Sequence, residues 1–204
     1  MNASERRKVR HVLLFSGHMI DAATRRTPRF PPSAERAATR EIERTLNLLK
    51  VREGDLGITE GACGGDLIFA EGLLARGASL QLHMPFHEAK FRKNSVTYEK
   101  KTPPSDRWLK RFLAVRNHPR VSVQAMPNDA GWLPRHPDPY ERCNLWMLRD
   151  ALALSGSRVR FICLWNGDRG DGRGGTEHMM RCIQQAGGEF IWIDSRNLSR
   201  TESR

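Results

Sequence analysis

Short apolar runs alternate with amphipathic segments along most of this chain. Runs rich in β-branched and aromatic residues, as in buried strands, lie at residues 11–15, 55–60, 79–84, 121–125, 158–165 and 189–194. Segments that read as helices lie between them, at residues 33–50, 66–76, 107–116, 139–154 and 176–186. Strands that alternate with helices predict an α/β fold, a three-layer sandwich with a mostly parallel sheet of five to six strands.

Two of the predicted helices begin with capping signals. Ser33 is expected to cap the helix over residues 33–50. Asp138 is expected to cap the helix that begins at Pro139, where Glu141 completes a capping box. We expect a basic tail at residues 1–10, a single domain at 11–195 and a flexible polar tail at 196–204.

The composition is that of a soluble globular protein, with 39% hydrophobic and 28% charged residues in a chain of 204. No apolar run approaches the roughly 18 residues that a membrane helix needs. The run Val12–Phe15 is too short for the core of a signal peptide. We therefore expect a cytoplasmic protein without a membrane partner.

The net charge of +11 is concentrated in two stretches of the chain. Residues 1–10 carry +3 and residues 90–120 carry +8, whereas the rest is close to neutral. A localised basic segment indicates an anionic partner: nucleic acid, a nucleotide or an acidic protein surface. A solvated basic helix explains the same charge, and the helical spacing of Trp108 and Phe112 favours core positions over base stacking.

The four cysteines, Cys63, Cys143, Cys163 and Cys182, form no CxxC pair and have no zinc-finger spacing with a histidine. We expect reduced thiols, no metal site and no resident cofactor.

Three glycine-bearing turns follow predicted strands: Ser16-Gly17-His18, Gly61–Asp66 and Gly174-Gly175-Thr176. Glycine lets the backbone approach a phosphate, and a helix that follows presents free N–H groups. Ordinary βα turns have the same composition, but three such turns at one sheet edge favour a phosphate or nucleotide site. None of them has the GxGxxG pattern of dinucleotide binding or the P-loop pattern.

These turns, together with Glu141-Arg142 ahead of the penultimate strand, resemble the SLOG superfamily over about residues 11–194. SLOG proteins are Rossmann-like nucleotide-binding domains. They include the LONELY GUY phosphoribohydrolases, the DNA-processing protein DprA and ligand-sensing domains. Gly61–Asp66 is similar to the GGG-type turn of the family, and Gly174-Gly175-Thr176 stands where its PGGxGTxxE motif would stand.

Residues 17–31 resemble a signature of a sensor-type branch of this superfamily, which implies that His18, Asp21 and Arg29 lie near the ligand. Asp21 is equally suited to a turn or a cap, and Arg29 to a surface ion pair. The ligand contacts that the resemblance implies are Ser16, Gly17, His18, Asp21, Arg29, Gly61, Cys63, Gly64, Gly65, Asp66, Arg142, Asn144, Gly174, Gly175 and Thr176.

The chain departs from the phosphoribohydrolase pattern at one position that matters for catalysis. That pattern needs a carboxylate three residues after Thr176, and Met179 stands there. Glu177 lies two positions earlier, which turns its side chain roughly 200° around a helix. Glu60, Asp66 and Glu177 are the candidates for a catalytic carboxylate.

Three functions stay open at this stage. The leading hypothesis is a sensor that binds a nucleotide-derived ligand and signals through a homo-oligomer or a partner. The second is an enzyme that cleaves an N-glycosidic bond in a nucleotide, with one carboxylate to stabilise the sugar cation or activate water. The third is nucleic-acid binding of the DprA type through residues 90–120, with an affinity that falls steeply with salt.

Overall fold

One six-stranded sheet forms the centre of the protein in the computed structural model, which describes residues 9–22, 25–97, 105–126, 138–155, 158–168 and 176–200. The strand order is β4-β3-β2-β1-β5-β6, and every neighbouring pair is parallel. The strands are β1 (Val12–Gly17), β2 (Leu56–Thr59), β3 (Ser79–Met84), β4 (Val121–Ala125), β5 (Val159–Trp165) and β6 (Glu189–Asp194).

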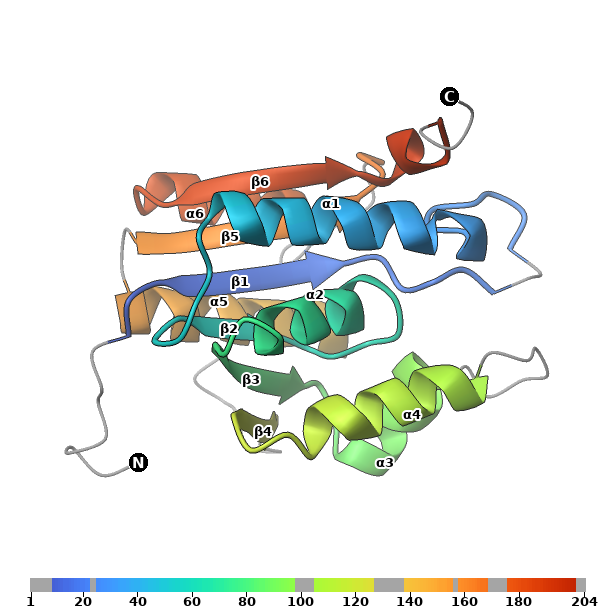
Figure 1. Ribbon diagram of the computed structural model, residues 1–204, viewed down its shortest axis with the longest axis horizontal. Coiled ribbons are helices and arrows are strands. Elements are labelled where there is room, and N and C mark those ends of the chain that lie inside the picture. Colours follow the sequence, from blue (N-terminus) through green and yellow to red (C-terminus); the bar gives the residue numbers. More distant parts are fainter. Residues whose placement is uncertain are drawn as a thin grey trace.

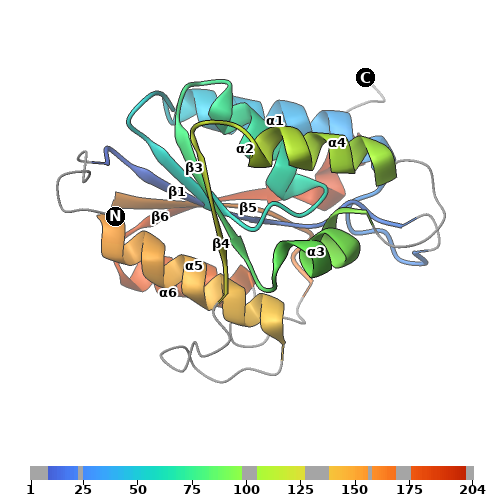
Figure 2. The same cartoon turned by 90° about the horizontal axis from the view of Figure 1, so that it is seen from below.

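Helices cover both faces of this sheet. They are α1 (Glu35–Leu48), α2 (Gly65–Leu74), α3 (Glu88–Phe91), α4 (Ser105–Arg116), α5 (Pro139–Ser155) and α6 (Thr176–Gln185). Helices α1, α2 and α4 lie on one face and α5 and α6 on the other, as the edge-on view shows (Figures 1 and 2). This confirms the predicted three-layer α/β sandwich, and the sheet is entirely parallel.

The chain reverses its direction of travel across the sheet once. From β1 it moves outward through β2 and β3 to β4, and α5 then carries it back beneath the sheet to β5, beside β1 (Figure 2). The strand order therefore reverses between β1 and β5, which pair from Val12 with Val159 to Gly17 with Leu164. In open parallel sheets, ligands bind at such a reversal, outside the carboxyl ends of the strands.

The central strand β1 serves two hydrophobic cores. Leu13 and Phe15 pack toward α1 and α2, whereas Val12 and Leu14 pack toward α5 and α6, and all four are at most 1% exposed. Successive side chains of a strand point to opposite faces, so a strand covered on both sides is apolar throughout. This double burial explains the continuous apolar run of the sequence.

The two predicted helix caps have different outcomes. The Asp138 cap is confirmed, because its Oδ1 accepts the backbone N–H of Tyr140 at 2.7 Å. The Ser33 cap is wrong: residues Pro32–Ala34 form a 3-10 turn, and α1 begins at Glu35. An N-cap needs extended backbone, and here the extended residue is Pro31, with φ −68° and ψ 153°.

The expected C-terminal tail begins later than predicted. Residues Ser195–Arg200 form a 3-10 helix in which Leu198 is 4% exposed and belongs to the core beside α1. The hydroxyl of Ser195 donates to the carbonyl of Arg29 at 2.6 Å. One apolar side chain in a polar segment thus extends the folded domain to residue 200, while residues 1–8 and 201–204 lie outside the described part.

Gly64 supports a testable prediction about the turn between β2 and α2. Its φ of +109° is a conformation that other residues rarely adopt, and a Cβ there would lie 2.5 Å from the backbone nitrogen of Ile20. We expect Gly64→Ala to lower the free energy of unfolding by about 3 kcal/mol or more, because strain and a backbone clash add up. Urea denaturation measures the loss.

Gly54 provides the matched control for this substitution. Its φ is +90°, but a Cβ would meet only Arg10 Cδ, at 3.9 Å. Gly54→Ala should therefore cost about 1 kcal/mol, for the backbone alone. If both variants lose the same free energy of unfolding, the close approach of the loop after β1 to Gly64 does not contribute to the cost of Gly64→Ala.

Candidate functional site

The carboxylate of Asp66 joins the turns that follow β1 and β2. Its Oδ1 accepts the N–H of Gly17, and its Oδ2 accepts the N–H groups of Gly61 and Ala62, each at 3.2 Å. The residue stands in the first turn of α2 and is 5% exposed. Because a side chain of the protein already satisfies these N–H groups, they are not available to a phosphate of a ligand.

Other N–H groups of the turn between β2 and α2 are also bonded within the protein. The N–H of Cys63 donates to the carbonyl of Ser95 at 2.8 Å, and that of Gly65 to the carbonyl of His18 at 3.1 Å. Gly64 forms an isolated antiparallel bridge with Met19. The turn is buried from residue 61 to 66, and with it the predicted ligand residues Gly61, Cys63, Gly64 and Gly65. The last three of these contact the loop after β1.

His18 and Asn166 meet at the carboxyl ends of β1 and β5. The backbone N–H of Asn166 donates to Nε2 of His18 at 3.1 Å, and the backbone N–H of His18 donates to the carbonyl of Leu164 at 2.9 Å. Asn166 is 4% exposed, whereas Ser16, Gly17 and His18 are half-buried. Polar side chains from both central strands therefore converge where the strand order reverses.

A second polar cluster follows β2 and faces α5. Burial, with the charge of Asp66 nearby, raises the pKa of Glu60 well above its usual value. The Cys143 thiol on α5 donates to the carbonyl of His83 at 3.4 Å, and burial together with the nearby Glu60 charge raises the pKa of this thiol as well. Burial therefore favours the uncharged forms of both groups, and the Cys143 thiol is a poor nucleophile.

The π-helix Arg92–Val96 borders this cluster from the other side. The hydroxyls of Ser95 and Tyr140 are hydrogen-bonded at 2.9 Å, and the Ser95 carbonyl holds the turn after β2 as described above. π-turns frequently occur at functional sites. Nothing in the local sequence pattern predicts this element.

Asp21 and Arg29 shape the loop between β1 and α1. Oδ2 of Asp21 accepts the backbone N–H groups of Arg29 and Phe30, both at 2.7 Å, and Oδ1 lies 3.3 Å from the guanidinium of Arg25. The N–H of Asp21 in turn donates to the carbonyl of Phe30 at 2.8 Å. Asp21 therefore closes this loop, and its expected role at the ligand stays a prediction.

The other expected site residues begin the helices of the opposite face. Arg142 and Asn144 are half-buried in the first two turns of α5, and Thr176 is half-buried at the start of α6. Glu177 is exposed and lies 3.8 Å from Arg181. Met179 is fully buried in the core. Gly174 and Gly175 lie outside the described residues.

Most described cations of residues 90–120 are paired within the protein. Arg111 on α4 binds Glu35 of α1 at 2.8 Å, binds Glu71 of α2, and stacks on Trp108 at 4.1 Å. Trp108 and Phe112 are 1% and 0% exposed, which confirms their core positions. Further pairs in this segment are Arg107–Glu35, Arg116–Glu88, Arg92–Glu88 and Arg120–Glu53.

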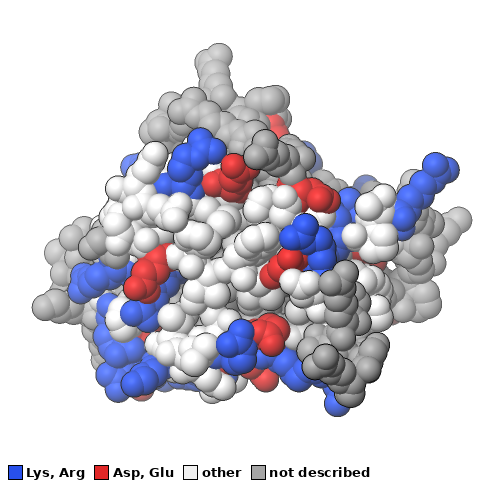
Figure 3. Space-filling view, turned by 90° about the horizontal axis from the view of Figure 1, so that it is seen from above, with Lys and Arg blue, Asp and Glu red and all other residues white. Residues whose placement is uncertain are grey.

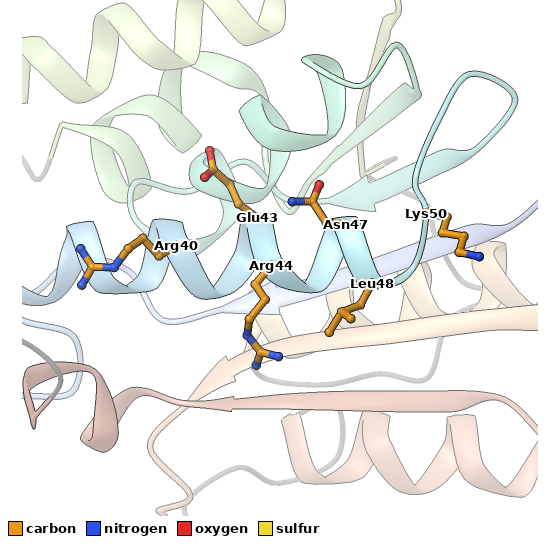
Figure 4. A pocket seen from close by; sticks show the side chains of 6 residues that line it. All are labelled: Arg40, Glu43, Arg44, Asn47, Leu48 and Lys50. Atoms are coloured by element: carbon orange, nitrogen blue, oxygen red, sulfur yellow. The ribbon is translucent and has the colours of Figure 1, made fainter.

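A surface pocket lies away from these residues (Figure 4). It is lined by Arg40, Glu43, Arg44, Asn47, Leu48 and Lys50, which all belong to α1 or directly follow it. The end of α1 is at the amino edge of the parallel strands, opposite the edge where β1 and β5 end (Figure 1). The side chains in Figure 4 spread to different sides of the helix, and no described polar group converges on a common point there.

Three residues near the site were missed as candidates by the sequence analysis. Asn166 directly follows β5, so the rule that ligands bind beyond the carboxyl ends of strands could have found it. Cys143 was taken as a core residue, and its contact with Glu60 depends on the packing of α5 against β2. Ser95 lies in an element that carries no periodic signal.

Comparison with known proteins adds no relative, because no family model and no curated protein matches the chain. Among the described residues, no helix combines the length and apolar character needed to cross a membrane. The same residues contain no group of three His, Cys, Asp or Glu side chains that could hold a metal ion. All four cysteines are free thiols, as expected.

The buried carboxyls predict how stability changes with pH. Burial raises the pKa of Asp66 from 3.8 to about 7 and that of Glu60 in the same direction. Between pH 4 and 7 the folded protein thus holds more protons than the unfolded chain, so its free energy of unfolding falls as pH rises. For Asp66 alone the fall is on the order of 4 kcal/mol.

Urea denaturation at pH 5 and pH 8 tests this expectation. Asp66→Asn should flatten the dependence, because it removes the buried carboxyl group that titrates in this range. If the protein is more stable at pH 8 than at pH 5, the buried carboxyls do not have these raised pKa values.

Proposed function

We propose that the protein binds a nucleotide-type ligand outside the carboxyl ends of β1 and β5, the position of the β1–β5 crevice in open parallel sheets. The observation that carries this proposal is the meeting of His18 and Asn166 at the reversal of the strand order. In parallel α/β sheets this is where phosphorylated ligands bind, between the turns that follow the two central strands. Half-buried Ser16, Gly17 and His18 line that position from β1.

The phosphate is expected at the start of α6 rather than at the turn after β2. The N–H groups of Gly61, Ala62, Cys63 and Gly65 already have partners within the chain. The first turn of α6 begins at Thr176, beyond the carboxyl end of β5, and a helix start favours an anion. Arg142, near the start of α5, supplies a cation for the same ligand.

Binding without turnover agrees best with the carboxylates of the described residues. Position 179, where the phosphoribohydrolase motif has its carboxylate, faces the core. Glu177 is exposed beside Arg181, and the carboxylate of Asp66 is held by three backbone N–H groups. We therefore favour a sensor, whose signal would pass through a homo-oligomer or a partner protein.

The first test is binding of AMP, ADP-ribose and cyclic dinucleotides, measured by thermal shift and calorimetry. A ligand at 100 times its Kd should stabilise the protein by about 2.7 kcal/mol. His18→Ala should weaken binding about tenfold, the value of one hydrogen bond to the ligand. Glu177→Gln serves as control and should bind like the parent chain, because this residue points to solvent.

A lack of binding to all these ligands would refute the proposal. If the parent chain and His18→Ala bind a nucleotide with equal affinity, the nucleotide binds elsewhere than at the β1–β5 crevice. Folding of each variant is checked by its melting temperature without ligand.

A nucleotide N-glycosidase is the second candidate, and the buried Glu60–Asp66 pair is the observation that favours it. Burial raises the pKa of Glu60, and the pKa of the neighbouring Asp66 lies at about 7, so the pair offers an acid and a base. Carboxyls with shifted pKa values cluster at catalytic sites. Release of free base from a nucleoside monophosphate, detected by mass spectrometry and lost in Glu60→Gln, would establish this activity.

Nucleic-acid binding is the weakest of the three functions. Because Arg92, Arg107, Arg111, Arg116 and Arg120 pair with carboxylates, much of the basic charge of residues 90–120 stabilises the packing of α4 and its neighbours. Affinity for single-stranded DNA that falls steeply between 50 and 200 mM salt would restore this function.

A further inference from the structure

Trp192 is an exposed aromatic ring on the edge strand β6. Its side chain is 42% exposed, whereas Trp165, on the neighbouring strand, is 8% exposed. The other large apolar residues exposed in the described chain are aliphatic: Leu48, Val123 and Leu154. These three lie on α1, β4 and α5, so the described residues form no extended apolar patch around Trp192.

The ring of Trp192 is held in one orientation. Its Nε1–H donates to the carbonyl of Trp165 at 2.9 Å, and the two indole rings lie 5.7 Å apart with a 44° tilt. The guanidinium of Arg196 lies 5.9 Å from the ring and is itself fixed by bonds to both carboxylate oxygens of Asp194. A fixed ring loses little conformational entropy when a planar ligand stacks on it.

Gly167 connects this ring with the β1–β5 crevice. It follows Asn166 directly, has φ +76°, and a Cβ there would lie 3.1 Å from the ring of Trp192 and 3.3 Å from Arg196. The approach of the segment after β5 to the indole thus depends on the absence of a side chain at this position.

The register of the sheet places Trp192 in the same row of paired residues as Ser16, at the end of β1. Ser16 pairs with Cys163, and Cys163 pairs with Trp192, across β1, β5 and β6. Residues paired in register point to the same face, here the face covered by α6. Two strand spacings separate Ser16 from Trp192, about 10 Å, and α6 begins at the same sheet edge.

We propose that Trp192, with Arg196 beside it, is the surface on which the base of the bound nucleotide stacks. This inference rests on the proposed function and names the part of the ligand that the edge strand recognises. A nucleobase fits better than an aliphatic partner, because the charged pair Arg196–Asp194 lies beside the ring. The view from above shows basic and acidic side chains around an uncharged area of this surface (Figure 3). A tryptophan face beside a guanidinium is the pairing that binds bases without regard to their edge groups.

The test compares ligands with and without a base in matched variants. Calorimetry measures the affinity of AMP, GMP, CMP, UMP and ribose 5-phosphate for the parent chain, Trp192→Ala, Trp192→Phe and Leu154→Ala. We expect Trp192→Ala to weaken the best-bound nucleoside monophosphate roughly 5- to 150-fold, as removal of a stacking ring does, and to leave ribose 5-phosphate unchanged. Trp192→Phe should stay within a few fold of the parent chain. Leu154→Ala, at another exposed apolar residue, should have the same affinity as the parent chain.

Several outcomes would overturn the inference, and they separate its failure from that of the proposed function. If the parent chain binds nucleotides and Trp192→Ala binds them equally well, the base lies elsewhere and the crevice proposal stands. Equal weakening of ribose 5-phosphate would show an effect on the fold instead of stacking. If none of the five probes binds the parent chain, the stacking inference fails, whereas the proposed function fails only if ADP-ribose and the cyclic dinucleotides do not bind either. A change in oligomeric mass of Trp192→Ala by size-exclusion chromatography, with unchanged affinity, would make Trp192 part of an interface between copies.

Discussion

The arrangement of the turns at the carboxyl edge of the sheet depends on the hydrogen bonds of the Asp66 carboxylate. It joins the backbone of two turns that are 44 residues or more apart in sequence, those of Gly17 and Gly61-Ala62. Three N–H bonds to one carboxylate compensate part of the cost of burying it, although burial still raises its pKa to about 7. The same residue stands in the first turn of α2, where the helix dipole favours a negative charge.

The buried carboxylate of Asp66 determines which backbone N–H groups remain available for a ligand. The glycine turn after β2 has the composition of a phosphate loop, yet its N–H groups are bonded to Asp66, Ser95 and His18. A hydrogen-bonded polar pair lies one strand further, at the β1–β5 reversal, where half-buried His18 meets Asn166. A similar compensation occurs in the basic segment, in which Arg111 neutralises Glu35 and Glu71 and so fastens α4 to α1 and α2.

Local patterns predicted the regular elements well and the irregular ones poorly. The strands Ser79–Met84, Val121–Ala125 and Glu189–Asp194 have the predicted bounds, because each is a compact run of apolar or alternating residues between polar turns. The 3-10 turn at Pro32, the π-helix at Arg92–Val96 and the packed Leu198 were missed, since tertiary contacts rather than periodicity stabilise them. For the candidate site, the sequence identified the turns, whereas the bonds from the backbone of both turns to Asp66 depend on the tertiary structure.

The sequence by itself determined the α/β class, the order of its strands and helices along the chain, and the turns at which strands end. These follow from the burial pattern of each segment and from short-range backbone preferences. Only the tertiary structure decided that β5 returns beside β1, that Glu60 faces Cys143, and that Ser16, Cys163 and Trp192 share one row. Such neighbours are far apart along the chain, and their contacts depend on which strands pair and in which register, which no local pattern encodes.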